Sequence, residues 1–269
     1  YDIVSKLNPK MIYTSISGFG TTGPMAHAPG FDLVGQGYSG MMAVNGDLEK
    51  GEGRVGFPIG DVSAGMWGYM ATLTALCGRL RTGKGAYVDV AMLDGLFAMM
   101  PSEVVAYTKL GDIAHSSGNI DPAAAPFGAL KTKDGAVIVA VLGDKLWQAF
   151  CKAIDRIDMY SDEKFKTGPD RIKNRLQLQH IIQPLFKEKT TAEWQQLLTA
   201  QGIPNGVVNN IKQTCEMAQI EARRMLVESG DYRVPGNPMK IQTSMESDSF
   251  AAPQELGQSS AKITKEFAS

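Results

Sequence analysis

The stretch RVGFPIGDVSAGMWGYMATLTALCGRLRTGKGAYVDVAM, residues 54–92, decides the fold class. An apolar segment near 54–59 predicts a buried strand, periodic apolar residues over 61–81 predict a long helix, and the apolar run over 86–92 predicts another strand. Strands that alternate with helices are typical of a mainly parallel sheet, because parallel strands need a long crossover connection. The sequence therefore predicts an α/β fold.

The helix predicted over 61–81 is the clearest element of this stretch. It runs into Arg81-Thr82-Gly83-Lys84-Gly85, and a glycine at this place is typical of a helix C-terminus. Its large apolar residues recur at helical spacing, so we expect them to pack in the core rather than to form a cofactor site. These residues are Val62, Met66, Tyr69, Met70, Leu73, Leu76, Cys77 and Leu80.

The same alternation continues on either side of this stretch. The expected elements are a strand over 11–17, a glycine-rich loop over 18–23, and helices near 31–44 and over 94–110. Residues 1–100 are therefore predicted to form part of a large α/β domain of Rossmann-like type. Because the chain opens on Tyr1 and soon reaches its first strand, we expect an upstream piece of this domain to be missing from it.

The middle of the chain predicts a smaller domain. Residues 101–126 include a stretch rich in Ser, Gly, Ala and Pro and are expected to be a linker, and residues 127–201 predict a small α+β domain. Its hairpin over 127–141 has an Asp-Gly turn that is expected to supply a positive φ. Its helices are expected over 144–154, 170–186 and 191–201, the last behind a capping box of Thr190 and Glu193.

Residues 202–269 have little regular periodicity. We expect a turn into a short strand near 202–208, a helix over 210–217, and then extended segments interrupted by Pro and Gly. Such segments are stable only when they lie over something else. We therefore expect this tail to wrap another domain or another subunit.

Composition excludes several classes of function. The chain has 43% hydrophobic and 20% charged residues and a formal net charge of −1, which does not favour nucleic acid as a partner. No apolar run reaches the roughly 18 residues of a membrane span, and the first residues lack a signal-peptide pattern. The three cysteines and three histidines are scattered, so we expect a soluble, cytoplasmic protein with no metal site.

Asp61 is the residue of most interest for chemistry, because it stands where the extended segment ends and the long helix begins. Aspartate is a preferred N-cap, and most aspartates at such a place serve as caps. A carboxylate there is also held ionised by the helix N-terminus, beside backbone N–H groups that are free to bind an anion. Spacing alone leaves both the capping and the reactive interpretation open.

Several motifs in register resemble one enzyme family. They are Asn8-Pro9-Lys10-Met11-Ile12-Tyr13, Ser17-Gly18-Phe19-Gly20-Thr21-Thr22-Gly23-Pro24, Gly30-Phe31-Asp32, Arg54-Val55-Gly56 through Asp61, Arg81-Thr82-Gly83-Lys84-Gly85 and Val88-Asp89-Val90-Ala91-Met92-Leu93-Asp94. Together they resemble the class III (CaiB/BaiF-type) CoA-transferases, and among these the acetyl-CoA and formyl-CoA:oxalate CoA-transferases. The tail, Lys262 to Ser269, is most similar to the acetyl-CoA:oxalate members. Later segments extend the similarity to the C-terminus, so the chain resembles the C-terminal two-thirds of a family member.

The resemblance implies a fold and a partner. In this family a large α/β domain is built from the N-terminal part and the returning C-terminus, a small domain is inserted between linkers, and two chains interlock as rings. The resemblance thus implies that residues 202–269 are a return linker and a C-terminal segment that packs on the large domain. We therefore expect a homodimer. The substrates implied are an acyl-CoA and a small carboxylic acid, with oxalate as one candidate, and no cofactor is expected to be tightly bound.

The resemblance also implies roles for particular residues. Asp61 matches the catalytic nucleophile, which forms an aspartyl-CoA thioester during CoA transfer. The positions implied to contact CoA or substrate are Pro29, Gly30, Phe31, Asp32, Met92, Gly118 and Asn119. Gln36, Tyr38 and Trp67 are near these motifs, but we expect them to be structural.

Two departures and two alternatives accompany the resemblance. Gly118 and Asn119 lie in Ser116-Ser117-Gly118-Asn119 rather than in the polyglycine run of formyl-CoA transferases, which argues against formyl-CoA as the donor. The acyl-CoA racemases of the same fold use a histidine in a Gly-His-Asp motif, where this chain has Phe31, whose ring cannot accept a proton. The remaining alternative is a CoA-binding fragment without turnover.

Overall fold

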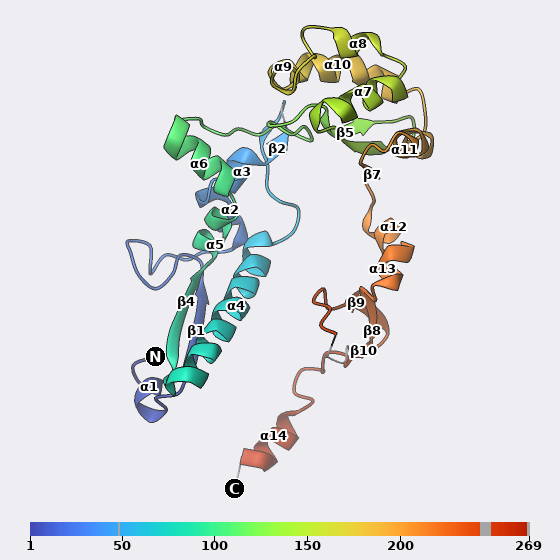
Figure 1. Ribbon diagram of the computed structural model, residues 1–269. Coiled ribbons are helices and arrows are strands. Elements are labelled where there is room, and N and C mark those ends of the chain that lie inside the picture. The colour runs from blue at the N-terminus through green and yellow to red at the C-terminus, as the bar shows by residue number, and fades with distance from the viewer. Residues whose placement is uncertain (48, 243–248, 268–269) are drawn as a thin grey trace.

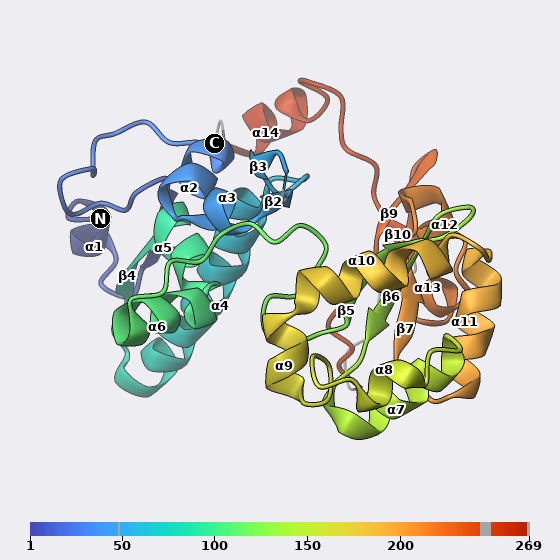
Figure 2. The same cartoon turned by 90° about the horizontal axis from the view of Figure 1, so that it is seen from above.

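The computed structural model describes residues 1–47, 49–242 and 249–267. In Figure 1 the elements up to α6 form one arm of the molecule and the elements from β5 to β10 form another. The view from above in Figure 2 shows the same separation, with an extended stretch between α6 and β5 connecting the two arms. The candidate residues near Asp61 all lie in the first arm.

The first arm contains the predicted parallel pair of strands. Strand β1 (Ile12–Ser17) pairs in parallel with β4 (Ala86–Ala91), in a register that runs from Ile12 opposite Ala86 to Ser17 opposite Ala91. Helix α4 (Ile59–Thr82) comes between them in the chain and packs on both. This order confirms the α/β class and places the carboxyl ends of both strands at one edge. Gly83 ends α4 with a φ of 72°, as the glycine pattern predicts.

The strand predicted near 54–59 is wrong. Residues 53–58 are irregular, and α4 already begins at Ile59, two residues before the predicted start. Pro58 has no N–H to give to a sheet ladder, and the N–H of Val55 donates instead to the side chain of Gln36 at 2.9 Å. The short antiparallel pair β2 (Gly46–Asp47) and β3 (Gly51–Glu52) precedes this segment.

Helix α4 packs on the sheet through its small residues and not through its large ones. Ala64 is buried with Val90 and Met92, and a Cβ on Gly68 would come within 2.8 Å of the side chain of Ile16. The predicted core stripe is largely exposed: Met66 is 60% and Leu80 78% accessible. That prediction is wrong for this chain, because periodicity identifies an apolar face but not whether the described residues supply a partner for it.

The other helices of this arm are shorter than the sequence predicts. The helix expected near 31–44 is divided at Gly40, whose φ is 87°, and the one expected over 94–110 is interrupted before Pro101, because a residue that precedes proline disfavours the helical region. The observed helices are α1 (Val4–Leu7), α2 (Asp32–Tyr38), α3 (Met41–Val44), α5 (Met92–Ala98) and α6 (Pro101–Leu110).

The second arm contains the predicted hairpin and the largest hydrophobic cluster. Strands β5 (Phe127–Lys131), β6 (Ala136–Ala140) and β7 (Asn205–Val207) form an antiparallel sheet in the order β5-β6-β7. The cluster beside it includes Trp147, Phe150, Phe186 and Trp194, all buried. The helices are α7 (Gly143–Ala153), α8 (Asp158–Ser161), α9 (Gly168–Lys173), α10 (Arg175–Phe186) and α11 (Thr191–Ala200).

One of two local predictions for this arm is confirmed and the other is wrong. The capping box is confirmed, since Thr190 and Glu193 exchange both hydrogen bonds. The positive φ predicted for the hairpin turn is wrong, because Gly135 does not adopt the left-handed region. The side chain of Asp134 holds the turn instead: its Oδ1 accepts the hydroxyl of Thr132 at 3.2 Å and the backbone N–H of Thr191 at 2.8 Å.

The remaining elements lead toward the C-terminus. They include a sheet of order β10-β8-β9 that the sequence did not predict. The elements are α12 (Ile211–Cys215), α13 (Ala218–Ala222), β8 (Leu226–Ser229), β9 (Tyr232–Pro235), β10 (Ser249–Phe250) and α14 (Ser260–Phe267). Helix α14 has no buried residue and stands apart in Figure 1. In the described ranges of the chain, every helix is too short or too polar to cross a membrane.

Candidate active site

Asp61 is the third residue of α4, and its side chain is exposed. The N-cap is Pro58, and its side chain accepts no hydrogen bond from the first turn. The interpretation of Asp61 as a helix cap is therefore wrong, since the helix begins two residues earlier than predicted. Within the residues that the structure describes, the carboxylate of Asp61 has no hydrogen-bond or ion-pair partner.

The first turn of α4 is held by a different aspartate. Oδ1 of Asp32, at the start of α2, accepts the backbone N–H of Gly60 at 2.7 Å. Oδ2 of the same carboxylate accepts the side-chain N–H of Gln36 at 2.8 Å, one turn along α2. The free N–H groups at a helix start require such partners, and a carboxylate is a strong acceptor for them. Asp32 thus caps a helix that lies 28 residues away in sequence.

One backbone donor beside Asp61 remains available. The N–H of Ile59 donates to the carbonyl of Phe57 at 2.8 Å, and the N–H of Val62 makes the first helical bond, to the carbonyl of Pro58 at 3.1 Å. With the N–H of Gly60 bound to Asp32, the N–H of Asp61 is the donor of the first turn that has no acceptor in the described part of the chain. An exposed carboxylate and an open N–H therefore stand together at a positive helix end, which favours an anion by about 0.3–1 kcal/mol.

The glycine motifs bring the neighbouring loops to this helix end. A Cβ on Gly18, directly after β1, would come within 2.9 Å of Cα of Gly30, and the carbonyl of Gly18 accepts the N–H of Leu93 in α5 at 3.1 Å. Gly18 is therefore required for close packing of backbones. Gly20 and Gly23 have φ values of 82° and 85°, which only glycine adopts readily.

The predicted contact residues occupy different environments. Phe31 is the N-cap of α2 and is 79% exposed, and Pro29 and Gly30 directly precede it. Asp32 has both carboxylate oxygens engaged, as described above. Met92 is buried with Ala64 and Val90, so its side chain belongs to the packing under α4 in this chain.

Gly118 and Asn119 belong to a different segment of the chain. They belong to the stretch between α6 and β5, and the carbonyl of Asn119 accepts the N–H of Ala129 in β5 at 2.9 Å. Gly118 has a φ of 62°, as a turning residue. No hydrogen bond of the described residues connects this pair with Asp61.

The residues that sequence reasoning placed in structural roles have clear contacts. Gln36 is fully buried and bridges Asp32 to Val55. Trp67 packs so closely on α5 that a Cβ on Gly95 would lie 2.7 Å from its ring. The sequence did not lead us to expect the hydrogen bond between the side chains of Asp32 and Gln36. Their spacing of four residues at a helix start was the available signal.

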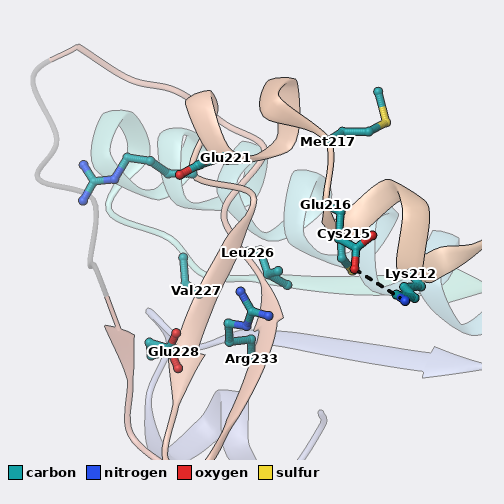
Figure 3. Close-up of a pocket in the computed structure, with 10 residues that line it drawn as sticks. Lys212, Cys215, Glu216, Met217, Glu221, Leu226, Val227, Glu228 and Arg233 are labelled. Carbon is teal, nitrogen blue, oxygen red and sulfur yellow. Dashed lines mark ion pairs between the residues drawn. The ribbon is translucent and has the colours of Figure 1, made fainter.

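Two cavities of the described residues are not lined by Asp61. A cavity of about 630 Å³ lies among α12, α13, β8 and β9, and Figure 3 shows its mixed charges, with Lys212 and Glu216 joined by an ion pair of 3.9 Å. This cavity belongs to the second arm. A smaller cavity of about 290 Å³ lies between α4 and α5, beside Trp67, Asp89 and Asp94. Among the residues described, no group of His, Cys, Asp or Glu is placed to hold a metal ion.

Comparisons with known proteins give one consistent family. The family model described as CoA-transferase family III matches residues 1–260. The chain is 32% identical to the acetyl-CoA:oxalate CoA-transferase of Acetobacter aceti, over 100% of this chain and 69% of that protein. It is 31% identical to the succinyl-CoA:glutarate CoA-transferase of Mus musculus, over 99% of this chain and 62% of that protein.

Solved structures agree with these sequence relatives. The crystal structure of a CaiB/BaiF family protein from Brucella suis superposes with a TM-score of 0.87 at 27% identity, over 99% of this chain and 70% of that one. A hypothetical protein from Mycobacterium tuberculosis superposes with a TM-score of 0.83 at 25% identity, over 97% and 70% of the two chains. The chain thus spans between 62% and 70% of the length of these four proteins.

Proposed function

Because the chain belongs to CoA-transferase family III, we propose that it carries the nucleophile of an enzyme that transfers CoA from an acyl-CoA to a carboxylic acid. The observation that carries the proposal is the state of Asp61: an exposed carboxylate in the first turn of α4, without a partner in the described residues, beside an N–H that is also free. An aspartate that served as the cap of this helix would have accepted an N–H of the first turn.

The reaction divides into balanced steps. The carboxylate oxygen of Asp61 attacks the thioester carbonyl, the carbon–sulfur bond breaks, and the products are a mixed anhydride and CoA thiolate. The thiolate then attacks the aspartyl carbonyl, which forms an aspartyl-CoA thioester and releases the donor acid as a carboxylate. The acceptor carboxylate attacks that thioester, and the steps run in reverse to give the new acyl-CoA and a free Asp61. Anhydride and thioester are similar in transfer potential, so the steps are nearly balanced.

Residues of this chain supply two parts of that chemistry. The helix end carries a partial positive charge, which stabilises negative charge on the groups that react beside it. The N–H of Asp61 is a donor for the oxygen that becomes negative when a carbonyl is attacked, and one such donor typically contributes 10²–10³ in rate. Neither contribution requires a metal or a cofactor. Pro29, Gly30 and Phe31, on the loop that packs against Gly18, are proposed to contact the CoA moiety.

The acid pair is proposed from the relatives. The relative from Acetobacter aceti is named for acetyl-CoA and oxalate and that from Mus musculus for succinyl-CoA and glutarate, so a dicarboxylic acid is the acceptor class to test first. The test is a screen of oxalate, glutarate and monocarboxylic acids against acetyl-, formyl- and succinyl-CoA, with new thioesters detected by mass spectrometry. Transfer to none of these acids would contradict the proposed activity.

A homodimer is proposed as the active form. The support is the apolar surface that the described residues leave uncovered on α4, where Val62, Met66 and Tyr69 are each at least half exposed, together with helix α14, which buries no residue. Exposed apolar area of this extent marks an association surface. Light scattering during size-exclusion chromatography tests this, and a monomer at micromolar concentration would contradict it.

One observation favours a second candidate, a CoA-binding chain without turnover. Val62, directly after Asp61, is 50% exposed and belongs to that uncovered face, so the surroundings of the nucleophile are open to water. Water competes with the acceptor acid for an activated acyl group. Calorimetry with CoA distinguishes the two: binding of CoA without transfer to any acid would favour the binding chain. The racemase alternative is disfavoured by Phe31, because an apolar ring cannot move a proton.

A further inference from the structure

We propose that Asp32 and Gln36 are positioning residues for Asp61, and that Asp32 acts on the first turn of α4 rather than on CoA. This inference rests on the proposed function, because it assigns a role toward the proposed nucleophile. It goes beyond it by naming the two side chains that determine where the nucleophile stands. The resemblance to the family implied instead that Asp32 contacts CoA or substrate.

The contacts form a chain of three short hydrogen bonds. Asp32 accepts the N–H of Gly60 at 2.7 Å with one oxygen and the amide N–H of Gln36 at 2.8 Å with the other. The side-chain oxygen of Gln36, Oε1, accepts the backbone N–H of Val55 at 2.9 Å. Val55 lies in the irregular segment that leads into α4, and Gly60 lies in the first turn of α4, so the start of this helix and the segment before it are both fastened to α2.

Both side chains are fixed in orientation by their partners. The amide of Gln36 must donate to a carboxylate and accept from a backbone N–H, so only one of its two flipped orientations satisfies both partners. Gln36 has no exposed surface, and water is not available to replace a lost partner. Asp32 must accept on both oxygens, which a carboxylate does and an amide does not.

Glycine at position 60 allows the contact with Asp32 and directly precedes Asp61 in the chain. A Cβ at this position would lie 2.9 Å from Oδ1 of Asp32 and 3.3 Å from Cδ1 of Leu96, which is too close for the present arrangement. The peptide unit that follows the fastened N–H of Gly60 carries the N–H of Asp61. A displacement of the first turn therefore moves the carboxylate and its neighbouring N–H together.

The same geometry argues against a CoA-binding role for Asp32. Each of its oxygens already accepts a hydrogen bond, and its negative charge would repel the phosphates of CoA. Substitution of a residue that contacts CoA and substitution of a positioning residue change different kinetic constants. Loss of a CoA contact raises KM, whereas misplacement of the nucleophile lowers kcat with little change in KM.

The test compares Asp32→Asn and Gln36→Leu with a matched control, Asp134→Asn, in the full chain under conditions where the wild type transfers CoA. Asp134 also binds the first turn of a helix, through the N–H of Thr191 at 2.8 Å, but in the second arm. We expect kcat to fall about 10- to 100-fold in the two network variants, as misplacement of a reacting group by about 1 Å does, with KM for acyl-CoA within about threefold. The control should retain its kcat.

Two further measurements keep the outcome decisive. Mass spectrometry of trapped protein should show slower formation of the aspartyl-CoA adduct in the network variants, and amide hydrogen exchange at Gly60 should be faster in folded Asp32→Asn than in the wild type. An unchanged kcat with a raised KM, or unchanged exchange at Gly60, would overturn the positioning role while leaving the proposed function intact. A folded wild type that transfers CoA to no acid would overturn the proposed function and, with it, the role assigned to Asp32.

Discussion

Replacement of Gly60 by alanine is expected to destabilise the protein, although alanine is the better helix former. The added Cβ would lie 2.9 Å from Oδ1 of Asp32 and 3.3 Å from Cδ1 of Leu96, so the carboxylate must move and its 2.7 Å bond to the N–H of residue 60 is lost. A hydrogen bond to a charged group contributes about 1.5–3 kcal/mol to the free energy of unfolding. The gain in helix propensity offsets about 1 kcal/mol of this.

Gly65→Ala is the matched control on the same helix. No atom lies within 4 Å of a Cβ placed there, so only the gain in propensity applies. The two variants are thus expected to differ by about 1.5–3 kcal/mol in the free energy of unfolding, because the propensity gain is common to both. With Gly65→Ala near 1 kcal/mol more stable than the wild type, Gly60→Ala should be about 0.5–2 kcal/mol less stable.

The assay is urea unfolding followed by circular dichroism, together with the melting temperature, which shifts by about 2–4 °C per kcal/mol for a protein near this size. Hydrogen exchange at the amide of residue 60 reports on the bond itself. The reasoning would be refuted if Gly60→Ala proved as stable as Gly65→Ala, because the contact with Asp32 would then carry no energy.

The remaining predictions concern other titratable side chains. Asp61→Asn should abolish CoA transfer. It should lower the free energy of unfolding by no more than about 1 kcal/mol, because the exposed side chain has no partner in the described residues and loses only its favourable interaction with the helix end. Activity above about one hundredth of the wild-type rate would contradict the assignment. The backbone N–H of Thr191, followed by its hydroxyl, lowers the pKa of Asp134 from 3.8, so this carboxylate stabilises the fold above that pH and the contribution is lost as the pH falls through the lowered value. Melting temperatures between pH 6 and pH 2.5 should therefore converge at the acid end for wild type and Asp134→Asn; a constant gap would refute the linkage. Burial raises the pKa of Cys151 to about 12, so a thiol reagent at pH 8 should label exposed Cys77 in the native protein and Cys151 only after unfolding. Labelling of Cys151 at the same rate as Cys77 would show that the core of the second arm opens readily.

The exposed apolar residues of α4 explain why the core packing predicted for this helix is wrong. Its large apolar residues do recur at helical spacing, but the contact with β1 and β4 uses Ala64 and Gly68, which allow the helix to approach the sheet closely. The hydrophobic effect requires a covering surface, and the described residues offer none for Met66 or Leu80. Periodicity therefore identified an apolar face, and the structure shows that the described residues leave it uncovered.

Local patterns in the sequence determined the α/β class, the hairpin of the second arm, the glycine end of α4 and the capping box of Thr190, because each depends on residues within a few positions of one another. The same patterns and motifs singled out Asp61. Only the tertiary structure decided how Asp61 is held. The cap of α4 comes from Asp32, 28 residues before Gly60, and its orientation comes from Gln36, which also binds Val55. Hydrogen bonds over that separation depend on the path of the chain in space, which no local pattern encodes.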